Sequence, residues 1–252
     1  MNMDAKKSFG SALPLVDASL KEAAVDFFHF QNRGYPRRSA LQWVGNRYAL
    51  GSSQRHLLLR GIFPQKDGLK RISKRARGSA WQKKLLVVDG HNVHITLESA
   101  LLERPLILAN DGAVRDLAGQ SSSFRVSPVS EMALQLLMEF FRHHRPLAVL
   151  FLFDAPMSHS GQLAGLYRQE LRGMGLKGDA RTVPVPEREI PLDHSVVASS
   201  DHALLDASRE WLDLARCTLN RTGLLHLAAD FSELRMVRPP RGFPYMPVSP
   251  LP

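Results

Sequence analysis

The chain has 252 residues, of which 44% are hydrophobic, a formal net charge of +9 at pH 7 and one cysteine. This length suffices for one domain with an accessory unit or for two small domains. No apolar run approaches the roughly 20 residues of a membrane span, and the first residues lack a secretory signal pattern. We therefore expect no membrane partner. Because Cys217 cannot form a disulfide within the chain, we also expect a cytoplasmic protein.

The positive charge is concentrated in the first third of the chain. Residues 1–84 contain 17 Lys and Arg against five Asp and Glu, whereas residues 85–252 contain 16 against 19. This asymmetry indicates a polyanionic partner for the first part and a different task for the second. No strongly apolar helix face accompanies the basic residues, so nucleic acid is favoured over a membrane surface.

Residues 15–63 are predicted to form a small domain of three short helices, after a flexible N-terminus at residues 1–14. Apolar residues recur at helical spacing, and Gly34 and Pro36 mark the end of one helix and the start of the next. Arginines surround this unit, so one of its helices could enter a nucleic-acid groove. The alternative is a packing module with a solvated arginine surface.

Residues 64–84 are predicted to be a basic linker or helix, with eight Lys and Arg and one acid. Basic residues recur four positions apart, so a helix here would be basic on adjacent faces. Each phosphate contact would steepen the salt dependence of binding. The alternative is a solvated linker. The candidate phosphate-binding residues are Lys70, Arg71, Lys74, Arg75 and Arg77.

From residue 85 apolar runs alternate with amphipathic segments. This pattern predicts an α/β domain over residues 85–222, with a mostly parallel sheet flanked by helices. A long helix follows the second run, with Ser127 as its expected N-cap. Residues 223–252 are expected to form a C-terminal segment with a proline-rich tail. The apolar runs are residues 85–88, 105–109, 148–153, 180–185 and 195–199.

Three of these runs end in an aspartate: LLVVDG with Asp89, LFLFDAP with Asp154 and VVASSD with Asp201. Ligands of an open parallel sheet bind beyond the carboxyl ends of its strands, so the three side chains could converge. Clustered carboxylates need a counter-charge, and oxygen-only ligands favour Mg²⁺ or Mn²⁺. Further candidate ligands, which also fit turn or surface positions, are Asp111, Asp116 and Asp206.

The motif LLVVDGHNV resembles the opening of NYN-type domains in the PIN-like nuclease superfamily, where a hydrophobic strand ends in an Asp-Gly-x-Asn turn. VLFLFDAP is similar to the second acidic strand end of bacterial NYN endoribonucleases, and VVASSD to their late Ser-Asp motif. These motifs cover about residues 85–220. The whole arrangement, with NRGYPRRSALQWVGNRYALGSSQRHLLLRGIF ahead of DGHNVHITLESALL and SGQLAGLYRQEL, also resembles an uncharacterised prokaryotic family that joins a small helical domain to this α/β domain.

The nuclease resemblance implies a PIN-like fold and a metal-dependent phosphodiesterase, in which carboxylates hold Mg²⁺ or Mn²⁺. Carried onto this chain, it implies that Asp89, Asp154 and Asp201 are the metal ligands and catalytic residues. Asn92 would orient Asp89 or contact a phosphate. Related nucleases often have an acid-rich helix start before the last strand. This chain departs from that pattern, because it has only Glu187, Glu189 and Asp193, among prolines, in that position.

The segment SHSGQ, residues 158–162, follows the second acidic strand end and begins a predicted helix. Backbone amides at the positive end of a helix can receive a phosphate. Ser158 and Ser160 are therefore candidate substrate-binding residues, and the alternative is that Ser158 is simply the N-cap of this helix.

The leading hypothesis from the sequence is metal-dependent hydrolysis of nucleic-acid phosphodiesters by an endoribonuclease whose basic N-terminal region binds the phosphate backbone. RNA is favoured over DNA by the resemblance alone. Two alternatives stay open. One is a non-catalytic nucleic-acid-binding protein that retains an acidic metal pocket, and the other is a small-molecule phosphohydrolase that uses the same carboxylates.

Overall fold

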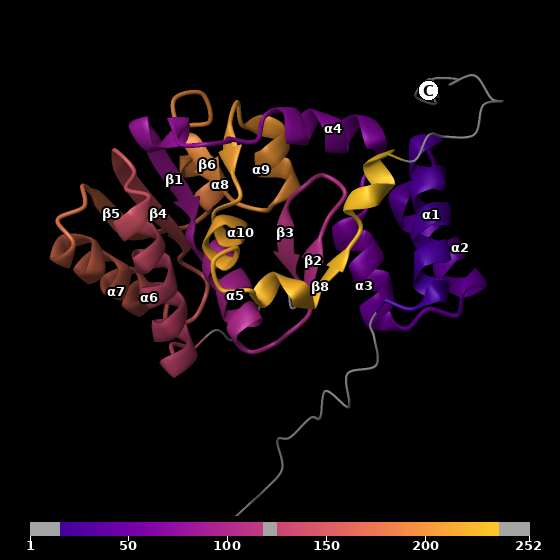
Figure 1. The fold of residues 1–252 in the computed structure, drawn as a ribbon, viewed down its shortest axis with the longest axis horizontal. Helices are drawn as coiled ribbons and strands as arrows, with labels where there is room; N and C mark the ends of the chain where they lie inside the picture. The colour runs from indigo at the N-terminus through magenta and orange to yellow at the C-terminus, as the bar shows by residue number, and fades with distance from the viewer. Residues whose placement is uncertain (1–15, 118–124, 237–252) are drawn as a thin grey trace, which may run out of the picture.

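The computed structural model describes residues 16–117 and 125–236, and Figure 1 shows how their helices and strands are arranged. A helical region comes first, followed by an α/β unit with a five-stranded sheet and a three-stranded sheet. The predicted α/β class, with a mostly parallel sheet flanked by helices, is confirmed. The expected flexible segment 1–14 and the tail from residue 237 lie outside the described residues.

The N-terminal region begins where Asp17 caps the first helix, because its Oδ1 accepts a hydrogen bond from the Leu20 N–H at 2.7 Å. Gly34, at φ +79°, follows that helix in a backbone conformation that glycine adopts at no steric cost. Three helices within residues 15–63 agree with the prediction, and the basic segment contributes a fourth. The helices are α1 (Ala18–Asn32), α2 (Arg37–Arg47), α3 (Ser52–Gly61) and α4 (Gln65–Ser73).

The larger sheet has the strand order β5-β4-β1-β6-β7, and every neighbouring pair is parallel. Its central strand β1 is buried on both faces, with Val88 in one hydrophobic cluster and Val87 in another. The carboxyl ends of β4, β1 and β6 therefore meet at one edge of the sheet. The strands are β1 (Leu85–Asp89), β4 (Ala148–Asp154), β5 (Gly178–Val183), β6 (Val196–Ala198) and β7 (Trp211–Leu212).

Helices connect and cover these strands. A short 3-10 helix, η1 (Ala80–Lys83), leads into β1. Ser127 caps the longest helix of the α/β unit, as predicted. None of the helices in residues 16–117 and 125–236 combines the length and apolar character needed to cross a bilayer. The α-helices are α5 (Gly90–Leu101), α6 (Pro128–His143), α7 (Ser160–Gly173), α8 (Pro186–Glu189), α9 (His202–Ala207) and α10 (Leu214–Leu219).

The second apolar run does not join the larger sheet, which corrects its grouping with the other predicted strands. It forms β2 (Leu106–Leu108), which pairs antiparallel with β3 (Val114–Asp116) and parallel with β8 (Ala228–Asp230). The turn between β2 and β3 contains Gly112 at φ +87°, which lets the chain fold straight back. The segment after residue 222 thus contributes a strand, flanked by the 3-10 helices η2 (Leu224–Leu227) and η3 (Ser232–Met236).

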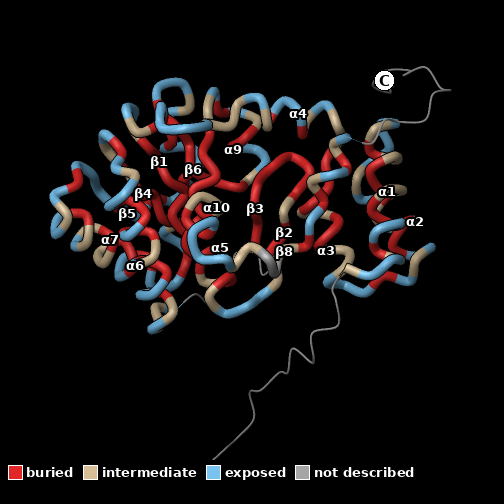
Figure 2. The backbone as a smooth tube through the Cα atoms, viewed as in Figure 1, coloured by how far each residue is buried: buried red, intermediate tan, exposed pale blue. Residues whose placement is uncertain are grey.

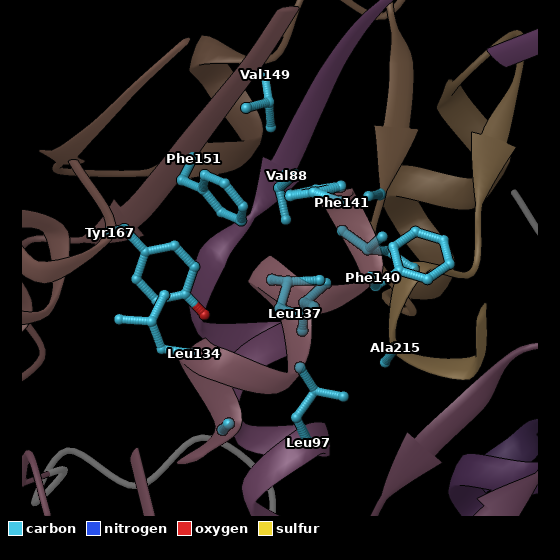
Figure 3. Packing of buried hydrophobic residues seen from close by; sticks show 14 of the residues in the cluster. Val88, Leu97, Leu134, Leu137, Phe140, Phe141, Val149, Phe151, Tyr167 and Ala215 are labelled. Carbon is cyan, nitrogen blue, oxygen red and sulfur yellow. The ribbon is translucent and has the colours of Figure 1, made fainter. Parts of the chain in front are cut away.

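Hydrophobic packing binds the parts together. In Figure 3, Phe151 and Tyr167 lie beside Val88 and Leu137, between the larger sheet and α6 and α7. A second cluster joins the helices α1 to α3 to the three-stranded sheet, and Figure 2 shows buried backbone in both places. At Gly61 of α3 an added Cβ would lie 2.6 Å from the Phe231 ring, so only glycine permits this contact. The helical region is therefore fixed against the α/β unit.

Candidate functional site: a pocket with acidic and arginine walls

Asp89 lies at the carboxyl end of β1 and is 3% exposed. Its Oδ2 accepts a hydrogen bond from the Ser199 hydroxyl at 2.9 Å, and its Oδ1 accepts one from the Asn92 N–H at 3.4 Å. Gly90 follows because a Cβ there would lie 2.5 Å from the Phe153 ring. Burial raises the pKa of Asp89 to about 7, and the negative charge of Asp154 adds to this rise. The hydrogen bond from Ser199 has the opposite effect, because it lowers the pKa.

The end of β6 is tied to Asp89 through serine and asparagine side chains. The Ser199 hydroxyl, which donates to Asp89, accepts a hydrogen bond from the Asp201 N–H at 3.0 Å. The Asn92 Oδ1 accepts bonds from both the N–H and the hydroxyl of Ser200, at 2.8 and 2.9 Å. The Asn92 side chain therefore holds the β6 end beside Asp89 through Ser200. The Asp201 carboxylate caps α9 through the N–H groups of residues 203 and 204.

A pocket of about 650 Å³ opens at this edge of the sheet, where the carboxyl ends of β1 and β6 face the helical region. Its lining carries acids, here called the acidic wall, and arginines, here called the arginine wall, with an aromatic ring among them. The acids are Asp89, Asp116, Glu187 and Asp201. The arginines are Arg37, Arg38, Arg60 and Arg115. The other polar or aromatic lining residues include Phe63, Asn92, Ser200 and His202.

Arg37 of α2 brings a positive charge to the pocket with no carboxylate bonded to it among the described residues. Its guanidinium donates to the backbone carbonyls of Leu59 and Ile62. It also lies 4.4 Å from the centroid of the Phe63 ring. Burial lowers the pKa of Arg37 to about 10, and the nearby positive charge of Arg115 adds to the effect. An anion in the pocket would relieve this repulsion.

The guanidinium of Arg60, on α3, also lacks a full set of hydrogen-bond partners in the described part of the chain. Its Nη2 lies 3.6 Å from Asp116 Oδ2. Its Nε is buried and has no hydrogen-bond partner within residues 16–117 and 125–236. A buried donor without a partner costs free energy, and a phosphate oxygen in the pocket is the kind of acceptor that it needs.

The structure brings two of the three strand-end aspartates to this pocket. Asp89 and Asp201 line it, whereas Asp154, the last residue of β4, is not among the lining residues and has its Oδ2 3.0 Å from Nδ1 of His91. His91 is buried on the first turn of α5. Asp154 still acts on the site through its charge, which contributes to the raised pKa of Asp89.

The additional candidate ligands separate into two groups. Asp116 lines the pocket, but Asp111 is fully buried between Arg71 and Arg115, with oxygen-to-nitrogen distances of 3.0 and 2.8 Å. These two arginines hold the pKa of Asp111 below its ordinary value although burial opposes them. Asp206 receives two hydrogen bonds from Arg71, at 2.8 and 2.7 Å. Asp111 and Asp206 already have cationic partners, which corrects their interpretation as metal ligands.

Most of the basic segment is also used inside the protein. Besides Arg71, the Lys74 Nζ donates to carbonyls at the end of α9, including those of residues 206 and 208 at 2.9 Å. The Arg75 Nη1 donates to the Gly112 carbonyl at 3.0 Å. These three side chains fasten α4 and the following residues to the α/β unit and are not directed at a phosphate, which corrects the prediction for them. Lys70 and Arg77 are exposed.

The predicted serines at α7 lie away from the pocket lining. His159, at φ +59°, occupies the N-cap position of α7, so neither serine is the N-cap. Ser160 is buried in the first turn, and its hydroxyl donates to the Ala155 carbonyl at 3.5 Å. Ser158 is exposed. Neither is among the residues that line the pocket.

The chemistry of the acidic wall suits a hard cation with an incomplete protein shell. Within the described residues, no three His, Cys, Asp or Glu side chains are arranged to enclose a metal ion. Mg²⁺ usually binds one or two protein carboxylates and completes its shell with water and substrate phosphates. The buried Asp89, with its raised pKa and oxygen-bearing neighbours, fits such an open site, because a cation would offset the cost of its charge.

The arginine wall is the part of the site that the sequence interpretation missed. Arg37, Arg38 and Arg60 belong to the arginines noted around the helical unit, but nothing in their spacing indicated that they face the strand-end acids. Arg115 lies on β3, where its Nε donates to the Ser200 carbonyl at 2.8 Å. Glu187 also lines the pocket, although the sequence interpretation treated the segment before β6 as a departure from the related nucleases.

Two family models match different parts of the chain. Residues 79–217 match the family described as "Domain of unknown function (DUF5616)", and residues 19–74 match "Protein of unknown function (DUF434)". A relative in Methanocaldococcus jannaschii, "Uncharacterized protein MJ0935", is 29% identical over 187 residues, which cover 74% of this chain and 89% of the relative. No solved structure matches the chain significantly. The first match spans the acidic wall, and the second spans α2 and α3.

Proposed function

The chain belongs to the DUF5616 family, and we propose that it is a metal-dependent hydrolase of phosphodiester bonds in nucleic acid, an endoribonuclease of the PIN-like type. One observation carries this proposal. Acids at the carboxyl edge of the sheet and arginines of the helical region line the same pocket. Phosphoryl transfer needs both, since a cation must be held near the reacting phosphate and the phosphate must be oriented.

The acidic wall would hold the cation. A bound Mg²⁺ or Mn²⁺ supplies an activated water and stabilises negative charge that develops on the phosphate. Asp89 and Asp201 are the residues that we assign to it, and Asp116 and Glu187 line the same space. Asn92 and Ser199 keep the two carboxylate-bearing turns together through the hydrogen bonds described above. The negative charge of Asp154 adds to the negative potential at Asp89, which a cation would offset.

The arginine wall would bind phosphate. A guanidinium matches the geometry of a phosphate with two parallel hydrogen bonds. Arg37 is suited to this because its bonds to carbonyl oxygens leave its charge without a counter-ion in the described part of the chain. The basic N-terminal region would thus act through α2 and α3, at the pocket, and less through α4.

The test is cleavage of labelled single-stranded and hairpin RNA by the purified protein with Mn²⁺. We expect cleavage that EDTA abolishes and that Asp89→Asn and Asp201→Asn each reduce by at least about a hundredfold. Glu189→Gln is the matched control, because Glu189 shares α8 with Glu187 but does not line the pocket. Full activity in both aspartate variants, with a folded protein, would remove these residues from the site.

One observation favours a second candidate, a small-molecule phosphohydrolase with the same carboxylates. The pocket volume of about 650 Å³ lies in the range of ordinary small-ligand sites. Hydrolysis of a generic phosphomonoester without cleavage of any oligonucleotide would favour this candidate. Salt-sensitive binding of RNA without turnover in Mg²⁺ or Mn²⁺ would instead indicate a non-catalytic binding protein.

A further inference from the structure

Three aromatic rings form a cluster on the outside of the helical region. Phe30 lies on α1, Tyr35 lies in the turn before α2, and Trp43 lies on α2. Their ring centroids are 5.2 to 6.0 Å apart, with edge-to-face geometry. Tyr35 is 42% exposed and Trp43 is 50% exposed. The rings support one another, yet two of them keep much of their surface in water.

The charge around this aromatic cluster is mostly positive, and Asp26, one turn before Phe30 on α1, pairs with Arg47 at 3.7 Å. Residues 27–66 contain seven Lys and Arg and no Asp or Glu. Arg37 and Arg38, which line the pocket, stand in the first turn of α2. Trp43 lies five and six residues further along α2, so it is fewer than two turns away along the axis and more than 90° around the helix from both, since a turn has about 3.6 residues. A polyanion held at the pocket could therefore reach this surface by passing around α2.

We propose that the cluster of Phe30, Tyr35 and Trp43 is a stacking surface for unpaired bases of a single-stranded nucleic acid whose phosphates reach the arginine wall. Exposed aromatic rings in a cationic setting bind single strands, because every base has a face that can stack while the phosphates meet the basic side chains. A duplex would not use the surface, because its bases are already stacked on one another.

This inference deepens the proposed function by naming single-stranded nucleic acid as the substrate class, and it rests on that function only for the link to cleavage. Binding can be measured in EDTA, where cleavage does not occur. A protein that binds single strands through Trp43 but never cleaves them would contradict the proposed hydrolase and leave the stacking surface in place.

Tryptophan fluorescence gives a direct test. Of the three tryptophans, Trp81 is 4% exposed and Trp211 is fully buried, so a response to an added ligand comes from Trp43. We expect a ten-nucleotide single-stranded RNA to quench this emission in EDTA. An abasic strand of the same length, which keeps the phosphates and lacks the bases, should quench much less. The Trp43→Phe variant should lose the response.

Affinity measured with an end-labelled strand completes the test. Trp43→Ala and Tyr35→Ala should each weaken binding at least about fivefold, in line with the loss of one stacked base. Met132→Ala is the control, because Met132 is equally exposed, at 55%, on α6 and lies outside the cluster. Circular dichroism would confirm that each variant is folded.

Two results would overturn the proposal. The first is equal quenching by natural and abasic strands, or unchanged affinity in both folded aromatic variants. The second is a change of oligomeric state in Trp43→Ala without any change in binding of the strand. That result would assign the aromatic cluster to contact between copies of the chain.

Discussion

Two groups of charged side chains adjoin Phe63, and they differ in how fully their charges are satisfied. In the first group, Arg71 and Arg115 hold Asp111 at 3.0 and 2.8 Å. In the second, the pocket, Arg37 bonds to carbonyl groups, and Asp89 bonds to a hydroxyl and an amide. The guanidiniums of all three arginines lie within 4.8 Å of the Phe63 ring centroid.

This difference in charge pairing indicates which group stabilises the fold and which group is available to bind a ligand. Arg71 joins α4 to the β2–β3 turn through Asp111 and to α9 through Asp206, so its group fastens the helical region to the α/β unit. In the pocket, Arg37 and Asp89 have no oppositely charged side chain bonded to them within the described residues, which is costly unless a ligand supplies one. We expect substitutions in the first group to change stability and substitutions in the second to change binding and activity.

The largest expected effect is on stability, in the Asp111→Asn variant. Removing this carboxylate leaves Arg71 and Arg115 facing each other without their shared counter-charge, although Arg71 keeps Asp206. We expect the free energy of unfolding to fall by about 3–5 kcal/mol, as for other broken buried pairs. Urea denaturation would measure it, with Asp193→Asn as control, because the Asp193–Arg209 pair is exposed. Equal losses in the two variants would contradict the structural assignment of Asp111.

The next effect is a pH dependence at Asp89. Its pKa of about 7 in the folded protein exceeds the ordinary value of 3.8, so the folded state retains a proton that the unfolded state loses as the pH rises. Without divalent metal, this carboxyl group makes the folded protein progressively less stable from about pH 4 to pH 7. Asp89→Asn should therefore gain stability relative to the wild type over this range, by up to about 4 kcal/mol above pH 7.

Thermal unfolding in EDTA at several pH values measures this difference. Adding Mn²⁺ should raise the wild-type melting temperature and shrink the advantage of Asp89→Asn, because a cation favours the charged carboxylate. A stability difference between the two proteins that does not vary between pH 4 and pH 8 would show that the pKa of Asp89 is not raised in the folded protein.

A smaller effect is expected for Arg37→Gln. This variant removes a pocket charge that has no bonded carboxylate in the described residues, so binding of a single-stranded oligonucleotide should weaken about tenfold. The slope of log affinity against log salt should become shallower by nearly one. The free energy of unfolding should fall less than in Asp111→Asn, because the loss is limited to hydrogen bonds to two carbonyls and the contact with Phe63. A variant that loses stability and keeps its affinity would place Arg37 with Arg71 as a structural residue.

The smallest effect is expected for the exposed basic residues of the segment after α3. Lys70→Gln and Arg77→Gln should change affinity by no more than about twofold, since neither lines the pocket. Lys74→Gln should instead lower stability, because its Nζ donates to the carbonyls that end α9. A loss of affinity in the two exposed variants as large as that of Arg37→Gln would extend the phosphate-binding surface to α4.

The sequence by itself determined the α/β class, the helices within residues 15–63 and the place of Asp89 and Asp201 at one edge of the sheet. These features follow from patterns that repeat over a few residues. An apolar run specifies a buried strand, and parallel strands bring their carboxyl ends to the same edge. The turn at Gly90 and the cap at Ser127 were local in the same way.

Only the tertiary structure decided which charges meet. Arg71 pairs with acids 40 and 135 residues away, and the run at residues 105–109 joins a sheet completed by β8. The arginines of α2 and α3 face the acidic wall because α1 to α3 share a hydrophobic core with the three-stranded sheet. The periodicity of a segment records which of its faces is buried, but it carries no information on which distant segment covers that face. The same residue type therefore links α4 to the α/β unit at Arg71 and is a candidate phosphate ligand at Arg37.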